Sequence, residues 1–253
     1  MFRYLTNILS DPRTALMFFL LALPGRLLAL SAHEFAHAWV ADKCGDPTAR
    51  MLGRLTLNPI KHLDLLGTLM MLFLGFGWAK PVPVNPRNYR RYRRDDLLVS
   101  IAGVTMNLIL FVLSFLICSA IVFFVVRGVG ASGDQARDFV YYAASFDADY
   151  ITMLSGSRML GYVYDMLTYF VFTNIALAIF NLLPVPPLDG YHVLNDLLLK
   201  RDLFASGQVA RVATAILFLL MFTDYLGTGM SYVVNVVLRG MGSLAQMLFV
   251  FIA

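Results

Sequence analysis

The chain has 253 residues, of which 59% are hydrophobic and only 14% are charged. Soluble domains carry about 25% charged residues on average, so this composition excludes an ordinary soluble protein and predicts an integral membrane protein. The formal net charge is +4, and the position of the cationic residues along the chain is more informative than their sum.

Five apolar stretches are long enough to cross a bilayer as helices, which takes about 20 residues. They cover residues 14–42, 96–126, 160–183, 207–223 and 230–252. A sixth stretch, 63–77, is shorter and rich in glycine, as is typical of a re-entrant or interfacial segment. We therefore predict an all-α polytopic membrane protein, a bundle of five to six transmembrane helices in a single domain over residues 1–253.

Two segments between the first and second long stretches favour extended backbone. Residues 54–57 alternate polar and apolar side chains, which predicts a short strand. Residues 80–86 contain three prolines, which remove amide donors and exclude a helix. We expect a short re-entrant or β-hairpin element near the cytoplasmic face, with residues 80–86 as an edge strand or a rigid loop.

Arginines crowd the residues just before the stretch at 96–126; they are Arg87, Arg90, Arg91, Arg93 and Arg94. Two tyrosines lie among them, a pattern that in a soluble protein can indicate nucleic-acid binding. Beside a transmembrane segment, a cytoplasmic anchor on anionic lipid headgroups explains the pattern better. We therefore expect the lipid bilayer, and no nucleic acid, as a partner.

Residues 33–37 read His-Glu-Phe-Ala-His inside the first apolar stretch. On a helix, His33 and His37 lie four residues apart on one face, so their imidazoles can bind one metal ion. Glu34 then lies beside the metal, in place to take a proton from a water molecule. Because ionisable side chains are costly within a membrane, the cluster predicts a metal site rather than hydrogen-bonded core histidines.

A catalytic zinc site needs a third protein ligand. The remaining histidines are His62 and His192, and the most conspicuous carboxylate is Asp189. Asp189 follows a span that ends in the proline-rich segment 184–187, and broken helices at membrane depth are tolerated where they line a cavity. A plain helix-ending turn explains the same residues equally well.

The two motifs together resemble the site-2 protease family of intramembrane zinc metalloproteases. That family pairs a His-Glu-x-x-His helix with a distant Asn-x-x-Pro…Leu-Asp-Gly segment, and residues 181–190 match it. Further similarity at 45–49, 53–59 and 81–86 extends the resemblance over residues 30–195. These residues resemble the small subgroup without PDZ and CBS domains.

The resemblance implies that one Zn²⁺ ion per chain is held by His33, His37 and Asp189, with Glu34 as general base. It gives Asn181 the role of donor to the oxyanion, whereas a polar residue at such a position also commonly hydrogen-bonds between helices. The implied activity is that of an intramembrane zinc endopeptidase, with its catalytic core at residues 14–195 and C-terminal helices at 207–252. The alternative is a non-proteolytic zinc-binding membrane protein, either a transporter or a regulatory scaffold.

The order of the motifs also constrains the topology. His37 and Asp189 both lie near the C-terminal ends of their stretches, so those stretches must cross the bilayer in the same direction to share a metal. Only 96–126 then crosses between them, and 63–77 does not. Because the arginines before residue 96 favour the cytoplasm, we expect a multi-pass protein of a bacterial or archaeal cell (inner) membrane, with its active site near the cytoplasmic side.

Other polar residues have open roles at this stage. Asn107 orients a ligand or substrate, or serves helix packing, and the nearby Gly103 lets its span approach the zinc helix closely. His62 is an accessory or inhibitory ligand, or a loop histidine bonded to Asp64. His192 is expected to support Asp189 from outside the metal site.

The expected substrates are transmembrane helices of other proteins, which must partly unwind before cleavage. An edge strand at 54–57 or 80–86 would capture the unwound segment by β-addition. A homo-oligomer or a regulatory membrane partner stays open, and Asp165, near the outer end of its span, has no assigned role.

Overall fold

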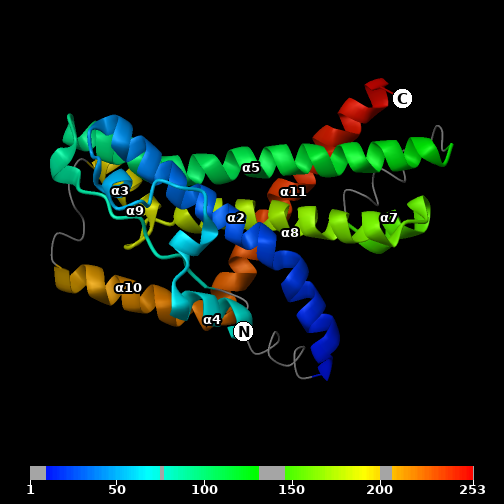
Figure 1. Cartoon of the computed structure of the whole chain (residues 1–253), viewed down its shortest axis with the longest axis horizontal. Coiled ribbons are helices and arrows are strands. Elements are labelled where there is room, and N and C mark those ends of the chain that lie inside the picture. Colours follow the sequence, from blue (N-terminus) through cyan, green and yellow to red (C-terminus); the bar gives the residue numbers. More distant parts are fainter. Residues whose placement is uncertain (1–9, 75–76, 131–145, 200–206, 253) are drawn as a thin grey trace.

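Three long helices dominate the computed structural model, which describes residues 10–74, 77–130, 146–199 and 207–252 (Figure 1). They are α2 (Pro12–Cys44), α5 (Tyr92–Gly128) and α8 (Arg158–Asn181), and each is long and apolar enough to cross a membrane. With 33 and 37 residues, α2 and α5 are about 50 and 55 Å long. Both exceed the hydrocarbon core of about 30 Å, so their ends extend into or beyond the headgroup region.

Local signals set the ends of these helices. The Asp11 carboxylate accepts the N–H of Thr14 at the start of α2, and Gly45 ends that helix with a φ of 110°. A left-handed residue at this point is typical of glycine. Ser157 caps α8 by accepting the N–H of Leu160. Helix α8 ends at Asn181, just before prolines that cannot continue it.

Short helices fill the connections. They are α3 (Thr48–Met51), η1 (Pro59–His62), α4 (Leu65–Leu74), η2 (Pro86–Asn88), α7 (Ala148–Ser155), α9 (Asp189–Val193) and η3 (Leu194–Leu199). Helix α4 has only 10 residues, too few to cross a bilayer. This length agrees with the expectation that 63–77 does not span.

The described residues contain no strand, and their β structure is a single bridge between Leu63 and Ala79. The strand predicted at 54–57 is therefore wrong. Residues 80–85 belong to no strand, and Pro86 begins the short helix η2. The two segments are joined by side-chain bonds instead of a backbone ladder, because the Arg54 guanidinium donates to the carbonyls of Lys80 and Pro81.

The C-terminal helices differ most from the predicted span count. Helices α10 (Gly207–Met221) and α11 (Asp224–Ile252) bend by 77° between Gly207–Met221 and Tyr225–Leu244, and as a bent pair they make one further candidate span. The 15 residues of α10 extend about 22 Å, which is shorter than the hydrocarbon core. The described part of the chain thus has three to four candidate spans, against the five to six expected.

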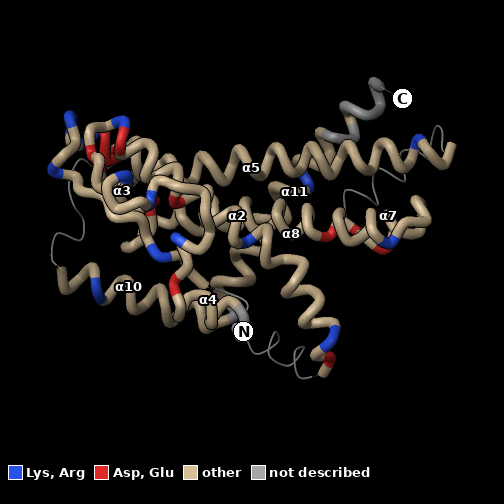
Figure 2. Tube along the Cα trace, viewed as in Figure 1, with Lys and Arg blue, Asp and Glu red and all other residues tan. Residues whose placement is uncertain are grey.

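Helices α2, α5 and α8 pack against one another. The side of α2 that faces its neighbours is lined by small buried residues, Ala22, Ala29, Ser31, Ala32, Ala36, Ala38 and Ala41, which allow close approach of helices. Charged residues gather at the end of the bundle that holds α3 and α9, while the long middle of α5 carries none (Figure 2). This distribution is the one expected for an integral membrane protein.

Candidate metal centre

The two histidines of the His-Glu-x-x-His motif face the same point from helix α2. The Nε2 atoms of His33 and His37 lie 3.0 Å apart, as the four-residue spacing predicts. His33 is buried and His37 nearly so, with 12% of its side chain exposed. The motif therefore presents two nitrogen ligands inside the bundle, as predicted.

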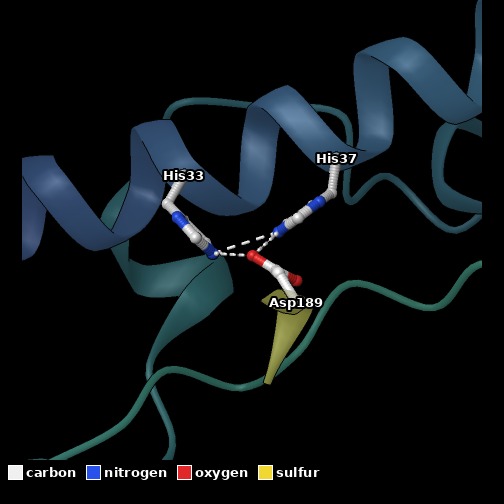
Figure 3. Close-up of side chains that lie close together, drawn as sticks. All are labelled: His33, His37 and Asp189. Carbon is white, nitrogen blue, oxygen red and sulfur yellow. Dashed lines mark hydrogen bonds and ion pairs between the residues drawn. The ribbon is translucent and has the colours of Figure 1, made fainter. Parts of the chain in front are cut away.

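Asp189 completes the cluster from the other end of the sequence. Its Oδ2 lies 3.3 Å from the Nε2 of His33 and 3.3 Å from that of His37 (Figure 3). Asp189 is the first residue of α9, so the predicted ligand lies directly after the turn that follows α8. Gly190 permits the tight return after α8, since a Cβ there would lie 2.3 Å from the Leu182 carbonyl oxygen.

Hydrogen bonds fix which nitrogen of each ring is available to a metal. His33 Nδ1 lies 2.6 Å from Asn107 Oδ1, and His37 Nδ1 lies 2.7 Å from the Val99 carbonyl oxygen. Asn107 Nδ2 donates to Asn174 Oδ1 and the Ala29 carbonyl, so Oδ1 is the atom that faces His33. Both Nδ1 atoms must then donate, which leaves the lone pairs of both Nε2 atoms directed at the shared point.

These ligand atoms fit zinc in number, type and spacing. Bonds of about 2.0–2.1 Å to a tetrahedral ion place its ligand atoms about 3.3 Å apart, close to the observed 3.0, 3.3 and 3.3 Å. Asp189 Oδ2 is buried, and within the described residues no group donates a hydrogen bond to it. Among those residues, His33, His37 and Asp189 form the one cluster of three such groups able to hold a metal ion.

The electrostatics of the cluster keep Asp189 available as an anion. Burial acts to raise the pKa of its carboxyl, but the two imidazoles at 3.3 Å, in their protonated form, outweigh burial and hold that pKa well below its usual range. When both Nε2 atoms are deprotonated, the same rings place two nitrogen lone pairs beside this carboxylate, and such a set of atoms attracts a divalent cation.

Helix α5 supports the site along one stripe. Val99, Gly103 and Asn107 follow one another at intervals of four residues, so they share a face of the helix. Gly103 lets that face touch both rings: a Cβ there would lie 2.5 Å from His33 Cε1 and 2.5 Å from His37 Nε2. The close approach expected of Gly103 is confirmed, and Asn107 is hydrogen-bonded to His33, a predicted ligand, instead of serving packing alone.

Glu34 lies between the two histidines in sequence and bonds elsewhere. Its Oε2 accepts the N–H of Val82 at 2.7 Å. Val82 belongs to the proline-rich residues 80–86, so that segment lies directly beside the predicted general base. Among the described residues, Oε2 and not Oε1 is the Glu34 oxygen that accepts this bond.

Asn181 and His62 do not join the cluster. Asn181, the last residue of α8, donates Nδ2 to the Leu177 carbonyl at 3.0 Å, and its predicted oxyanion role stays a prediction. His62 is buried and bonds to the Thr56 carbonyl at 2.7 Å, so the expected bond to Asp64 is wrong. The Thr56 carbonyl reaches it because residues 54–57 turn back instead of forming a strand.

His192 supports a different carboxylate from the expected one. Its Nδ1 lies 3.0 Å from Asp96 Oδ2, at the start of α5, and this contact raises the pKa of His192. The three-residue spacing predicts that His192 and Asp189 share a face of one helix. Helix α9 is only five residues long and packs against α5, which brings His192 to Asp96 instead. Asp165 lies within α8, away from the metal cluster.

Sequence reasoning placed Val82 in a segment next to the active site but missed its bond to Glu34, and it missed Val99 and Asn174 altogether. Val82 and Val99 act through backbone atoms, which leave no mark in a sequence pattern. Asn174 is fully buried, and a polar residue inside an apolar span is the signal that identifies such a position.

Comparison with known proteins agrees with this geometry. The model of peptidase family M50 matches residues 18–223. The chain is 38% identical over 202 residues to "Putative zinc metalloprotease YwhC" of Bacillus subtilis, covering 80% of each chain. It is 30% identical over 210 residues to "Putative zinc metalloprotease Rip2" of Mycobacterium tuberculosis, covering 79% of this chain and 67% of the relative.

The protein of the same name from Mycolicibacterium smegmatis is 30% identical over 182 residues, which are 70% of this chain and 57% of that protein. No solved structure matches the chain significantly. The family match, the relatives and the apolar helices show a membrane zinc metalloprotease. The chain therefore belongs to peptidase family M50, the site-2 protease family.

Proposed function

We propose that this protein is an intramembrane zinc endopeptidase with one Zn²⁺ per chain, which hydrolyses peptide bonds within or near transmembrane segments of membrane proteins. The supporting observation is the convergence of His33, His37 and Asp189 within 3.3 Å of one another between apolar helices. Glu34, which adjoins His33, is the single glutamate in the sequence.

The residues of the site divide the chemistry between them. A zinc ion held by His33, His37 and Asp189 would supply Lewis-acid chemistry, which acidifies a water molecule and polarises the scissile carbonyl. Glu34 takes the proton of the attacking water and passes it to the leaving amine. Asn181 donates to the developing oxyanion, since an amide carries two donor hydrogens and the Leu177 carbonyl uses only one.

A substrate helix has to unwind before its carbonyls can be attacked, and residues 80–86 offer an edge for the unwound chain. Val84 is the better contact there, because the Val82 N–H is already bonded to Glu34 and Val84 is 37% exposed. Replacing Val84 with Pro removes its N–H and should raise the KM for a transmembrane substrate without loss of zinc. Val84→Ala retains the N–H and should bind substrate nearly as well as the wild type; equal effects of the two changes would contradict this role.

The arrangement also supports a cytoplasmic position for the active site. Helix α9, which carries Asp189, lies at the end of the bundle where charged residues gather (Figure 2). The arginine-rich residues 87–94 lead into the first turn of α5 at that end, and cationic flanks favour the cytoplasm. Together with the bacterial relatives, this supports a bacterial or archaeal inner membrane as the location.

The decisive test is Glu34→Gln in proteoliposomes that contain a transmembrane substrate. Loss of the base removes proton transfer, so cleavage should fall by at least 100-fold, while zinc per chain stays at the wild-type value. Asp149→Asn, an exposed change on α7, is the matched control and should cleave normally. Retention of cleavage by Glu34→Gln would refute the proposal, and zinc binding without cleavage in the wild type would favour a transporter or scaffold.

A further inference from the structure

A segment distant in sequence holds the predicted general base. Glu34 Oε2 accepts the N–H of Val82 at 2.7 Å, and Val82 is buried. We call residues 80–86 the strap. Within the described residues the strap belongs to no strand, so a sheet does not hold the Val82 N–H in place, and other contacts must do so.

Asp46 attaches the other end of the strap. This residue is fully buried just after α2, and its Oδ2 accepts the N–H of Asn85 at 2.6 Å. Its Oδ1 accepts Nδ2 of Asn88 at 2.8 Å, and also the N–H and hydroxyl of Thr48. Burial acts to raise the pKa of the Asp46 carboxyl, but these donors outweigh burial and lower that pKa. Asp46 is thus a buried anion with its hydrogen bonds satisfied, which is costly to disturb.

Because of its prolines, the strap has very few backbone N–H groups that can donate hydrogen bonds. Between residues 81 and 86, the three prolines have no N–H, so the amides are those of Val82, Val84 and Asn85. Two of these three donate to carboxylates, those of Glu34 and Asp46. Prolines and the residues before them are confined to extended backbone, so the position of Asn85 is coupled to that of Val82. On the other side of Val82, Arg54 holds the carbonyls of Lys80 and Pro81.

We propose that Asp46 is a positioning residue for Glu34: it anchors Asn85, and through the stiff strap it holds the Val82 N–H on the carboxylate of the general base. The proposal rests on the proposed function only in giving Glu34 that role. Glu34 would then keep one oxygen fixed by the strap and present the other to the attacking water, as general-base catalysis requires.

Hydrogen exchange of the zinc-loaded, full-length protein tests the coupling directly, since a peptide over residues 81–86 reports on only three amides. Asp46→Asn places an N–H₂ group where Oδ2 accepts the Asn85 N–H, so the strap loses its anchor. We expect the amides of both Asn85 and Val82 to exchange at least tenfold faster. If only the Asn85 amide exchanges faster while the Val82 amide stays protected, loss of the Asp46 bond does not affect Val82, and the proposal is overturned.

Asp42→Asn is the matched control. It lies near the same end of α2 and breaks an ion pair with Arg50, whose distance is 3.0 Å, without touching the strap. Exchange of residues 81–86 should be unchanged in this variant. Acceleration in both variants would mean a general loosening of the helix end, which would also overturn the proposal.

Kinetics distinguish positioning from a merely structural role. In Asp46→Asn we expect zinc content and KM to stay at wild-type values while kcat falls about tenfold, a part of the 10²–10⁴ that a general base contributes. Val82→Pro removes the N–H that Asp46 is proposed to position on Glu34. The losses of kcat in Val82→Pro and Asp46→Asn should therefore be far from additive in the double variant. Additive losses, or a rise in KM alone, would contradict the proposal.

Two further points keep the outcomes separate. If Asp46→Asn does not fold, Asn88→Ala is the substitute, because it removes one hydrogen-bond donor, 2.8 Å from Asp46 Oδ1. This variant should accelerate exchange of the Val82 amide about threefold. No change in that exchange would count against the proposal. Exchange needs no cleavage, so persistent cleavage by Glu34→Gln refutes the proposed function and leaves the exchange result standing. Conversely, a protected Val82 in Asp46→Asn refutes only the role of Asp46.

Discussion

Gly103→Ala should disrupt the proposed metal site although it replaces none of the predicted ligands. The added Cβ would lie 2.5 Å from His37 Nε2 and 2.5 Å from His33 Cε1, whereas ordinary contact begins at 3.4 Å. Both rings, or the whole of α5, must therefore move by about 0.9 Å, and overpacking of this kind typically costs about 1–3 kcal/mol of stability.

The metal site tolerates much less displacement than the fold does. Ligand distances in zinc sites are held within about 0.2 Å, and a 1 Å misplacement of a reacting group costs about 100-fold in rate. We therefore expect Gly103→Ala to bind zinc at least 100-fold more weakly than the wild type. The measurements are zinc per chain after dialysis against a competing chelator, kcat/KM on a transmembrane substrate and the thermal midpoint.

Gly128→Ala on the same helix is the control, because a Cβ there meets nothing within 4 Å. That variant should retain zinc, activity and stability. If Gly103→Ala bound zinc as tightly as Gly128→Ala, the close contact of α5 with both imidazoles would be refuted, and with it the geometry from which the site is derived.

Further predictions concern the surroundings of the cluster. Asn107→Ala removes the acceptor of His33 Nδ1 and should weaken zinc binding 10–100-fold, measured by competition with a chromophoric chelator; Asn174→Ala, one contact further out, should have a smaller effect, and the reverse order would contradict the network. A strong chelator should abolish cleavage and lower the thermal midpoint, because zinc binds only the folded state; added Zn²⁺ should restore both, and failure to do so would argue against a resident metal. Burial and the neighbouring Asp96 raise the pKa of Asp196 from 3.8 to about 6, so its stabilising effect is complete below pH 3.8 and is lost as the pH rises through about 6. The thermal midpoint should fall across that window more in the wild type than in Asp196→Asn, and parallel curves would refute the coupling.

The sequence by itself determined the parts of this protein that depend on local periodicity and composition. Apolar length predicted α2, α5 and α8, since crossing a bilayer demands about 20 residues whatever they pack against. The four-residue spacing of His33 and His37 determined that both rings share a face. Gly103 was anticipated for a similar reason, because small residues inside a span favour close helix packing.

The tertiary structure decided the features that join residues far apart in the chain. From the residues alone, the proline-rich segment before Asp189 was as consistent with a simple turn as with a ligand, and the 3.3 Å distances to both imidazoles distinguish the two. His62 and His192 were expected to bond to carboxylates near them in sequence, Asp64 and Asp189. Tertiary packing instead selects Thr56, six residues from His62, and Asp96, 96 residues from His192. The apolar pattern separates 207–223 from 230–252, but the 77° bend that makes α10 and α11 one candidate span is a property of the tertiary structure.

The contacts around Glu34 show the physical reason most clearly. The Val82 N–H and the Val99 carbonyl are backbone groups that every residue except proline carries in full, so no side-chain pattern marks them as partners of Glu34 and His37. Their positions follow from how the strap and α5 pack against α2, across separations of 48 and 62 residues. The sequence was sufficient to predict the side chains of the site, whereas only the tertiary structure shows which backbone atoms orient them.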